Sequence, residues 1–308
     1  MNPWLMGLLA AAVSALAGAG ATTWWEEVPD DGEVAAVAEG VDFDEVDEDE
    51  RPDRLWLGRS APPEIDVVHP LAALDDSEIE LLAMNDPAAL GSISLGSPSR
   101  GALINSLAFP ESDLWILADP EHAWGTLESV QFVQHAIKRV NEQFEDTPVL
   151  YVGDFSAKRG GRLKPHKSHQ SGRDVDIGYY YLNESVWYRR ANASNLDRAR
   201  SWALLSTLLK ETRVEYVFID KYVQPLLEEY ALAQGEDPEW LARVFNRSGR
   251  KDSVVRHRSG HATHMHVRFE NPTAELTASR SLEWLQKAGL VPGRRAPARG
   301  RARRSARR

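Results

Sequence analysis

The sequence predicts an α+β domain built on a central antiparallel sheet with flanking helices. Segments with helical spacing of apolar residues are mixed along the chain with short β-branched segments. They do not follow the regular strand–helix–strand alternation of a parallel α/β fold. Apolar and polar residues also alternate within a strand candidate, as expected when one face of an antiparallel sheet is buried. These observations together favour the α+β class.

The helices of this fold are indicated by apolar residues three or four positions apart. The clearest helix covers residues 126–144, with Thr126 as a suitable N-cap and Glu128 in the first turn. Other helices are expected over residues 196–210, 221–233, 239–245 and 281–288, with a shorter helical pattern over residues 77–84. These segments supply the helices that flank the predicted sheet.

The strands are indicated by short apolar and alternating segments. Residues 214–219 are mostly apolar and β-branched, which indicates a buried strand. Residues 265–269 alternate between apolar and polar side chains, the pattern of a half-buried strand. Further strands are expected over residues 114–117, 149–152 and 174–180. The run at residues 95–101 is rich in Gly, Ser and Pro and is expected to be a turn that opens the domain.

The two ends of the chain differ in composition from the region between them. Residues 1–21 contain an apolar run followed by small residues, which predicts a signal peptide, with an uncleaved membrane anchor as the alternative. Residues 22–65 are rich in acids and predict a disordered linker, followed by an ambiguous lead-in over residues 66–94. Residues 95–290 are expected to form the folded domain, and residues 291–308 a disordered basic tail.

The N-terminal segment predicts export to the periplasm or cell envelope, with no membrane span left after processing. The formal net charge of −10 averages an acidic and a basic tail, so it says little about the folded region. In an exported protein the basic tail is expected to contact an anionic envelope polymer and not nucleic acid. The oligomeric state is left open.

Composition and motifs exclude several kinds of site. The chain has no cysteine, which excludes disulfides, a cysteine nucleophile and thiolate metal ligands. It has no G-x-S-x-G and no H-E-x-x-H, which argues against an α/β-hydrolase serine and excludes a helix-borne zinc site. A glycine pair after residue 153 lacks the Lys-Ser/Thr ending of a phosphate-binding loop.

Six of the nine histidines lie in two short segments. The first segment contains His166 and His169, just before a strand candidate. The second contains His257, His261, His264 and His266. The scattered His69, His122 and His135 are given no role. Two histidine clusters in a chain without cysteine point to a metal site with nitrogen and oxygen ligands.

Strand alternation predicts that polar residues near these histidines share one face of the sheet. Asp174 and Asp176 are two positions apart and therefore point to the same side of their strand. By the same rule His264, His266 and Arg268 share a face of the second strand. The intervening apolar residues would pack into the core, so the polar side chains are expected to face a cleft.

The turn at Gly172 would bring His169 back over Asp176. Together with a histidine of the second strand, these residues would make a His₂Asp ligand set with an open position for water, which describes a catalytic zinc site. The alternative is a cluster of hydrogen-bonded surface histidines beside ordinary strand carboxylates.

The order of these motifs resembles the penicillin-insensitive murein endopeptidases, within the lysostaphin-type and D-Ala-D-Ala metallopeptidase (LAS) fold group. The matching parts are Gly153-Asp154, Gly160-Gly161, the block S-H-Q-S-G-R-D-V-D-I at residues 168–177 and H-x-x-H-M-H-V-R at residues 261–268. The likeness covers roughly residues 95–271. It implies a LAS-like fold and hydrolysis of the D-alanyl–diaminopimelate cross-link of peptidoglycan by a zinc enzyme that β-lactams do not acylate.

The resemblance also implies a role for each site residue. The zinc ligands would be His169, Asp176 and His266, with His166 as a further candidate. His261 and His264 would be catalytic, either of them as the proton acceptor, and His166 and Arg173 would bind substrate. No Asp and His between residues 176 and 257 match the pattern of a second site, so one Zn²⁺ per chain is expected.

Two departures and two rival functions accompany this resemblance. Better-known members carry cysteines, and Met265 stands where the family usually has Phe. A carboxypeptidase or dipeptidase on the same fold is one rival, disfavoured by the closer match to the endopeptidase motifs. A non-enzymatic wall-binding module is the other, disfavoured because every expected site residue is present.

Overall fold

The computed structural model describes residues 73–245 and 253–291. The predicted signal peptide, the acidic linker and, apart from its first residue, the basic tail lie outside these residues. The described chain mixes helices and strands, in agreement with an α+β fold. No helix in the described ranges is both long and apolar enough to cross a membrane.

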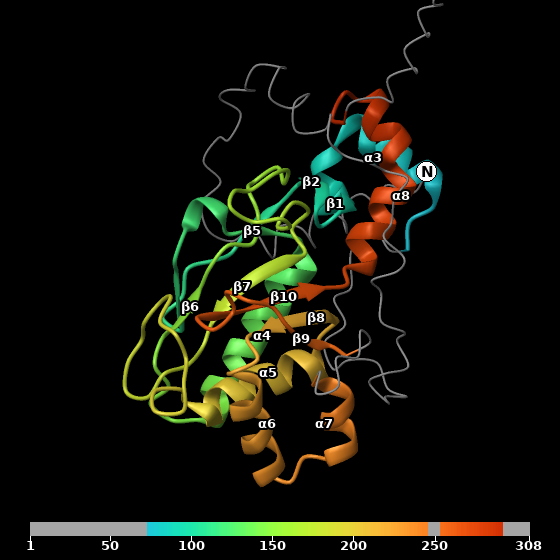
Figure 1. Cartoon of the computed structure of the whole chain (residues 1–308). Helices are drawn as coiled ribbons and strands as arrows, with labels where there is room; N and C mark the ends of the chain where they lie inside the picture. Colours follow the sequence, from blue (N-terminus) through green and yellow to red (C-terminus); the bar gives the residue numbers. More distant parts are fainter. Residues whose placement is uncertain (1–72, 246–252, 292–308) are drawn as a thin grey trace, which may run out of the picture. The chain divides into compact units, whose positions relative to one another are not determined.

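A six-stranded sheet lies at the centre of the described residues, in the order β4-β6-β7-β10-β8-β9 (Figure 1). Its strands are β4 (Trp115–Leu117), β6 (Leu150–Val152), β7 (Asp174–Gly178), β10 (His264–Phe269), β8 (Val214–Ile219) and β9 (Val255–His257). The four inner strands pair antiparallel, as predicted. The outer strands β4 and β9 pair parallel with their neighbours, so the prediction is wrong at the two edges. Each edge strand has only three residues, too few for alternation to reveal a direction.

Four helices lie along the chain between β5 (Trp124–Gly125) and β9. They are α4 (Leu127–Gln143), α5 (Arg198–Glu211), α6 (Gln224–Ala233) and α7 (Pro238–Val244). Thr126 caps α4 as predicted, since its side chain accepts a hydrogen bond from the amide of Ser129. Asp197 caps α5 in the same way, so this helix begins two residues later than predicted. Helix α6 begins three residues later than predicted, because the chain at Asp220 first forms a turn.

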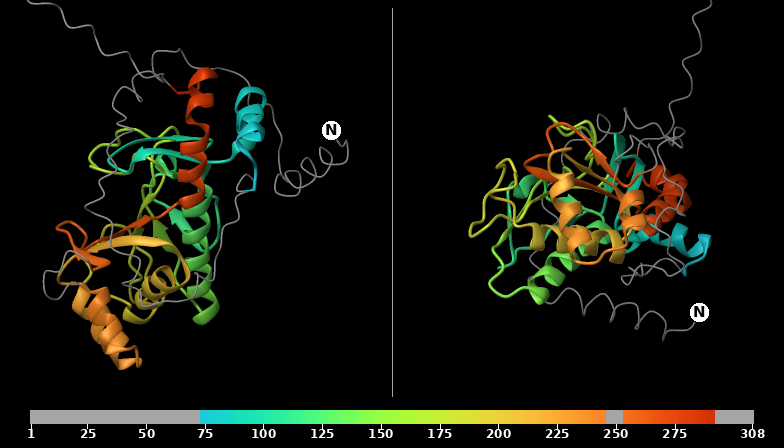
Figure 2. Two further views of the ribbon diagram at one scale, coloured as in Figure 1. Left: turned by 90° about the vertical axis from the view of Figure 1, so that its right-hand side faces the viewer. Right: turned by 60° about the horizontal axis from the view of Figure 1, so that its bottom comes forward.

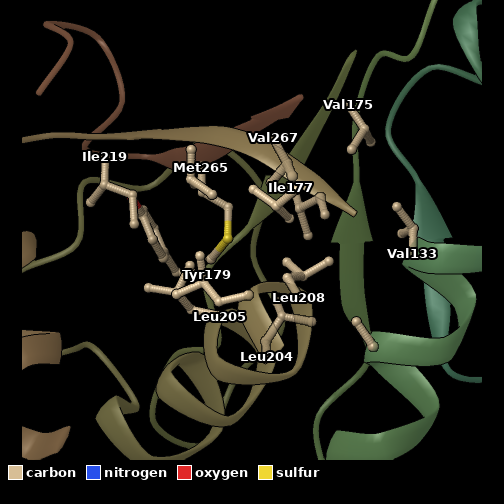
Figure 3. Packing of buried hydrophobic residues seen from close by; sticks show 14 of the residues in the cluster. Val133, Val175, Ile177, Tyr179, Leu204, Leu205, Leu208, Ile219, Met265 and Val267 are labelled. Carbon is tan, nitrogen blue, oxygen red and sulfur yellow. The ribbon is translucent and has the colours of Figure 1, made fainter. Parts of the chain in front are cut away.

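One face of the sheet forms the main hydrophobic core. Val175, Val267 and Val217 lie side by side on β7, β10 and β8, and Ile177 lies opposite Met265. All five side chains are fully buried. Figure 3 shows side chains of this face packed against leucines of α5. The apolar half of the alternating pattern is therefore the part that holds the helices on the sheet.

A second hydrophobic cluster joins the N-terminal part of the described chain to the last helix. It contains residues of α3 (Asp76–Asn85), the hairpin β1 (Ile93–Ser97) and β2 (Arg100–Ile104), and α8 (Pro272–Lys287). Helix α3 has a capping box and lies beside α8 (Figures 1 and 2). The run expected to be only a turn is thus a hairpin whose tip is the turn.

Helix α8 is twice as long as the predicted segment at residues 281–288. Its first turn contains Pro272, which has no amide hydrogen to leave unsatisfied at that position. The amides of Thr273 and Ala274 donate to the carboxylate of Glu128 in α4. A side chain 145 residues away in the sequence therefore caps the start of this helix, so no local sequence pattern predicts where the helix begins.

Candidate active site

The face of the sheet opposite the core gathers the polar residues of the two motifs. His266 on β10 lies directly opposite Asp176 on β7 and Phe218 on β8. His264 lies opposite Gly178 at the end of β7. The antiparallel register thus agrees with the predicted alternation and brings together two motifs that are 90 residues apart.

Three donor atoms converge on this face. His169 Nε2 lies 3.0 Å from His266 Nδ1 and 3.4 Å from Asp176 Oδ1. His266 Nδ1 lies 3.0 Å from the same Asp176 oxygen. All three residues are buried, at 0–5% exposure. The atoms form a small triangle, with each residue on a different part of the chain.

His169 is held in position by its backbone and by its other ring nitrogen. Its φ of +67° is left-handed, which histidine adopts more readily than bulky or branched residues do. Its amide donates to Asp174 Oδ2 at 2.9 Å, and Nδ1 lies 2.8 Å from the carbonyl oxygen of Phe155. Because a carbonyl only accepts, Nδ1 carries the proton. In the neutral ring, the lone pair of Nε2 therefore faces Asp176 and His266.

Asp174 is the buried anion behind the triangle. Arg268 Nε donates to Asp174 Oδ1 at 2.6 Å, and His266 Nε2 lies 3.3 Å from the same oxygen. The histidine contact is electrostatic, since His266 Nε2 has no aligned hydrogen-bond acceptor among the described residues. Burial opposes ionisation of Asp174, but Arg268 and then His266 outweigh it and hold its pKa well below the usual range. Asp174 thus contacts two ligand candidates, the backbone amide of His169 and the ring of His266.

The electrostatics of the triangle favour positive charge. Burial opposes ionisation of Asp176, but His169 and His266 hold its pKa well below the usual range. Burial also opposes protonation of His266, but Asp174 and Asp176 outweigh it and raise its pKa. One carboxylate and two imidazoles at this spacing, with the Asp174 anion behind them, are a donor set that a divalent cation would stabilise.

His166 lies at the edge of the triangle and has a partner of its own. Its Nε2 is 2.8 Å from Asp154 Oδ2, whereas its Nδ1 is 3.8 Å from Asp176 Oδ2. His166, His169 and Asp176 also meet the spacing of a three-ligand metal group. The structure therefore brings His166 to the site, farther from Asp176 than His169 and His266 are.

The rings of His261 and His264 lie side by side, with centroids 5.0 Å apart, and the His261 ring centroid is 5.9 Å from that of His266. His264 Nε2 is 3.6 Å from Asp176 Oδ2, and its Nδ1 is 2.9 Å from Thr263 Oγ1. Burial, followed by the charges of His264 and His266, lowers the pKa of His261 to about 4. Burial also lowers the pKa of His264. Both rings are therefore neutral near pH 7, with an unprotonated nitrogen on each.

Arg173 is not among the groups gathered at the triangle. Its buried guanidinium pairs with Glu275 of α8 and donates to Ser171 Oγ and to the carbonyl of Gly96. These contacts tie the start of β7 to α8 and to the β1–β2 hairpin. The substrate-binding role of Arg173 stays a prediction.

Two aromatic residues without an assigned role in the sequence lie against the histidines. The Phe218 ring stacks on His266 with centroids 5.6 Å apart, and the Tyr188 ring stacks on His264 at 5.5 Å. Tyr216 and Phe218 alternate with Val217 in β8, but both faces of this strand are apolar. Alternation alone therefore does not reveal which residues face the site.

A second group with metal-ligand spacing lies near Asp154. Asp119, His122 and Asp154 lie within ligand distance of one another. Their side chains are 44%, 33% and 24% exposed, and His122 Nδ1 is already 2.9 Å from Asp119 Oδ2. A half-exposed ion pair between residues three apart is an ordinary surface feature.

Comparison with known proteins places this site in a family. The family model described as penicillin-insensitive murein endopeptidase matches residues 94–287. A protein of that name from Klebsiella pneumoniae (strain 342) is 26% identical over 203 residues, covering 59% of this chain and 68% of the relative. One from Pectobacterium atrosepticum is 28% identical over 207 residues, covering 62% and 69%. One from Shigella dysenteriae is 28% identical over 228 residues, covering 67% and 78%.

The matched region contains all of β7 and β10 and every histidine and aspartate of the triangle. The family expected from the motifs is therefore confirmed. The chain belongs to the penicillin-insensitive murein endopeptidase family and is a peptidase.

Proposed function

We propose that the protein is a zinc-dependent endopeptidase that hydrolyses D-alanyl–diaminopimelate cross-links of peptidoglycan. The observation that carries the proposal is the convergence of His169 Nε2, Asp176 Oδ1 and His266 Nδ1 within 3.0–3.4 Å. Family membership supports the substrate class, because the relatives are named murein endopeptidases. The sheet with ligands on one face and helices on the other is also compatible with a LAS-type fold.

The donor set fits a single zinc ion. Four tetrahedral donors at 2.0–2.1 Å from zinc lie about 3.3 Å apart, close to the spacing of the three atoms here. The set of two imidazoles and one carboxylate leaves a fourth position open, as catalytic zinc sites do. His169, Asp176 and His266 would hold the ion. When bound, zinc supplies Lewis acidity that lowers the pKa of water to about 7 and polarises a carbonyl oxygen.

The chain's own residues would move the proton. Hydrolysis of an amide requires a group that takes a proton from water and delivers it to the leaving amine. His261 and His264 are neutral near pH 7 and adjoin the triangle, so either is suited to accept it. The ring that is not the acceptor would stabilise the negative charge that develops on the carbonyl oxygen.

His166 is better suited to orient substrate than to complete the ligand set. Its Nε2 is engaged by Asp154, and its Nδ1 lies beyond hydrogen-bond distance of Asp176. A ring held by one nitrogen presents the other toward the site. His166 would then contact the substrate or a water molecule beside the scissile bond.

The proposed substrate requires a location outside the cytoplasm. Peptidoglycan lies outside the cytoplasmic membrane, so an exported protein of the periplasm or cell envelope is required. The signal peptide at residues 1–21 would provide export, and the acidic and basic tails would flank a peptidase domain at residues 95–290. No serine acyl-enzyme is involved, so β-lactams would not inhibit the reaction.

Product analysis on purified sacculi tests the proposal. A cross-link endopeptidase converts dimeric muropeptides to monomers and frees no alanine. Release of D-alanine without loss of dimers would indicate a carboxypeptidase or dipeptidase. Sacculi that bind the protein and keep all their cross-links would indicate a wall-binding module. Either result would overturn the proposed function.

A further inference from the structure

An exposed tyrosine lies against a candidate catalytic histidine. The Tyr188 side chain belongs to the segment between β7 and α5, and the residue is 62% exposed. Its ring nevertheless stacks on His264 with a 5.5 Å centroid separation and an interplanar angle of 23°. His264 in turn lies 3.6 Å from Asp176. One face of the Tyr188 ring is thus fixed beside the site, while much of the residue is left in water.

The backbone at Tyr188 is in an unfavourable conformation. Its φ of +64° is left-handed, which bulky residues rarely adopt. The next residue is held by an ion pair of Arg189 with Glu184 and by a hydrogen bond from the Tyr181 hydroxyl to the Arg189 carbonyl. A residue kept in such a conformation by its surroundings is a known mark of ligand-contacting positions.

The neighbouring Trp187 sits in a place made by two glycines. A Cβ on Gly153 would lie 2.6 Å from the Trp187 ring, and a Cβ on Gly178 would lie 3.6 Å from it. The Tyr151 ring stacks on the indole with centroids 6.2 Å apart. The same Cβ on Gly153 would lie 3.3 Å from the Asp176 side chain. The indole is therefore packed close to a zinc-ligand candidate.

We propose that Trp187 and Tyr188 form the wall against which the stem peptide of the substrate binds beside the scissile bond. This inference rests on the proposed function. The Trp187 and Tyr188 rings lie 5.9 Å and 5.5 Å from the His264 ring, whose Nε2 is 3.6 Å from Asp176, so a peptide bound at the His264 end of the site would lie next to them. Aromatic faces contact peptide planes and methyl groups by dispersion and do not require charge. The D-alanyl residue, with its methyl side chain and flanking amide, has the chemistry that fits this wall.

The segment that carries the wall is also tied to the second histidine motif. The amide of Ala191 donates to the carbonyl of Ala262 at 2.7 Å, and the Tyr179 hydroxyl donates to the carbonyl of His261 at 2.9 Å. The segment of the wall is therefore joined to the candidate proton acceptors by one hydrogen bond from a residue before Trp187 and one from a residue after Tyr188. Substrate positioning by Tyr188 and proton transfer would share one rigid frame.

The test uses full-length protein with zinc and a purified cross-linked muropeptide dimer. Tyr188→Ala is expected to raise KM about tenfold or more with little change in kcat, because it removes contact area that substrate and transition state share. Tyr188→Phe should keep wild-type kinetics, since the ring face is retained. Tyr222→Ala is the matched control: Tyr222 is also 62% exposed, and its ring packs with Arg190 and Lys221.

A fourth variant separates binding from folding. Tyr188→Gly should match the KM of Tyr188→Ala, yet unfold at a temperature no lower than wild type, because glycine adopts the left-handed conformation without strain. Zinc content should be unchanged in every variant. A wild-type KM for Tyr188→Ala, an equal loss in Tyr222→Ala, or loss of zinc from Tyr188→Ala would overturn the inference. A wild-type enzyme that leaves the dimer intact would instead overturn the proposed function.

Discussion

The two faces of the central sheet are built from alternate residues of the same strands, and their chemistry is opposite. On β7, Val175 and Ile177 face the helices, whereas Asp174 and Asp176 face the site. The apolar face contributes stability in proportion to the area it buries. The polar face buries carboxylates and imidazoles, which costs free energy unless they are paired. Burial on one side thus offsets the cost of pre-arranging ligands on the other.

The buried charges of the polar face are balanced by neighbouring side chains. Arg268 neutralises Asp174, and Tyr216 covers the guanidinium at 4.7 Å. The remaining charge lies between Asp176 and the two histidines, where a cation is favoured. Stability and ligand binding should therefore be separable by changing neighbouring residues of one strand.

The largest effect is expected from Asp176→Ala. Loss of this carboxylate removes one corner of the triangle, so bound zinc should disappear from the purified protein. Sacculus digestion should fall by more than about 10⁴-fold, since general acid–base help alone is worth 10²–10⁴. The variant should unfold near the midpoint of the metal-free wild-type protein in thermal denaturation, because bound zinc would itself raise the midpoint. Collapse of the fold would show that the two faces are not separable.

The next effect is expected from His261→Ala. If His261 is the proton acceptor, turnover should fall by roughly 10²–10⁴-fold while zinc content stays at the wild-type level. His264→Ala should also keep zinc and lose activity. Turnover and metal content measured on the same preparations distinguish a proton acceptor from a zinc ligand. Full activity in His261→Ala would remove it from the mechanism, and loss of zinc would make it a ligand.

Asp174→Asn is expected to reduce both the stability of the fold and the affinity for zinc. Asp174 contacts Arg268 and both histidine ligand candidates, so its charge serves the fold and the site together. Leaving a buried guanidinium without its anion is expected to cost about 3–5 kcal/mol. Zinc affinity should weaken about 10- to 100-fold, as for other groups that orient metal ligands. Urea unfolding and zinc competition titrations measure the two effects.

The same variant gives a pH test in the metal-free protein. The pKa of Asp174 is well below its usual range in the folded state, so its stabilisation is present above the unfolded value, about 3.9. That stabilisation is lost as the pH falls through the folded pKa. The stability difference between wild type and Asp174→Asn should therefore shrink below about pH 4, and, because Asp174 also raises the pKa of His266, it should decrease as the pH rises through the pKa of that ring. A pH-independent difference would mean that shape, not charge, sets the cost.

A smaller and purely structural effect is expected from Ile177→Ala. Ile177 is fully buried next to Asp176 and points into the core. The cavity should cost about 2–5 kcal/mol in free energy of unfolding. Zinc content at 25 °C should match wild type, provided the variant remains folded. A loss of zinc in folded Ile177→Ala would show that packing on one face controls ligand geometry on the other.

Local patterns in the sequence were enough to predict the inner strands and which of their residues share a face. Alternation needs only the pleat of a single strand, so Asp174 with Asp176 and His264 with His266 could be placed together. The resemblance then named the residues that converge. The strand β9, the parallel pairing of both edge strands and the first half of α8 were missed, because each edge strand has only three residues and α8 begins at a cap provided by Glu128.

The rest of the site depends on register and backbone conformation, which a single sequence does not reveal. Phe218 faces His266 because β8 pairs with β10 at that residue, and β8 is apolar on both faces. Tyr188 contacts His264 because its backbone is left-handed, a conformation that is not expected for a tyrosine from the sequence. Arg173 shares its motif with the site but pairs with Glu275 of α8. Proximity in sequence is therefore a weaker guide here than position on a strand.

The count of zinc ions bound by the full-length protein tests the central claim most directly. Native mass spectrometry after zinc loading and desalting should give one ion per wild-type chain and none in Asp176→Ala. A His122→Ala control should keep the single ion, because Asp119, His122 and Asp154 are expected to form an ordinary surface cluster. Two ions in wild type, or one that persists in Asp176→Ala and vanishes in His122→Ala, would contradict the account.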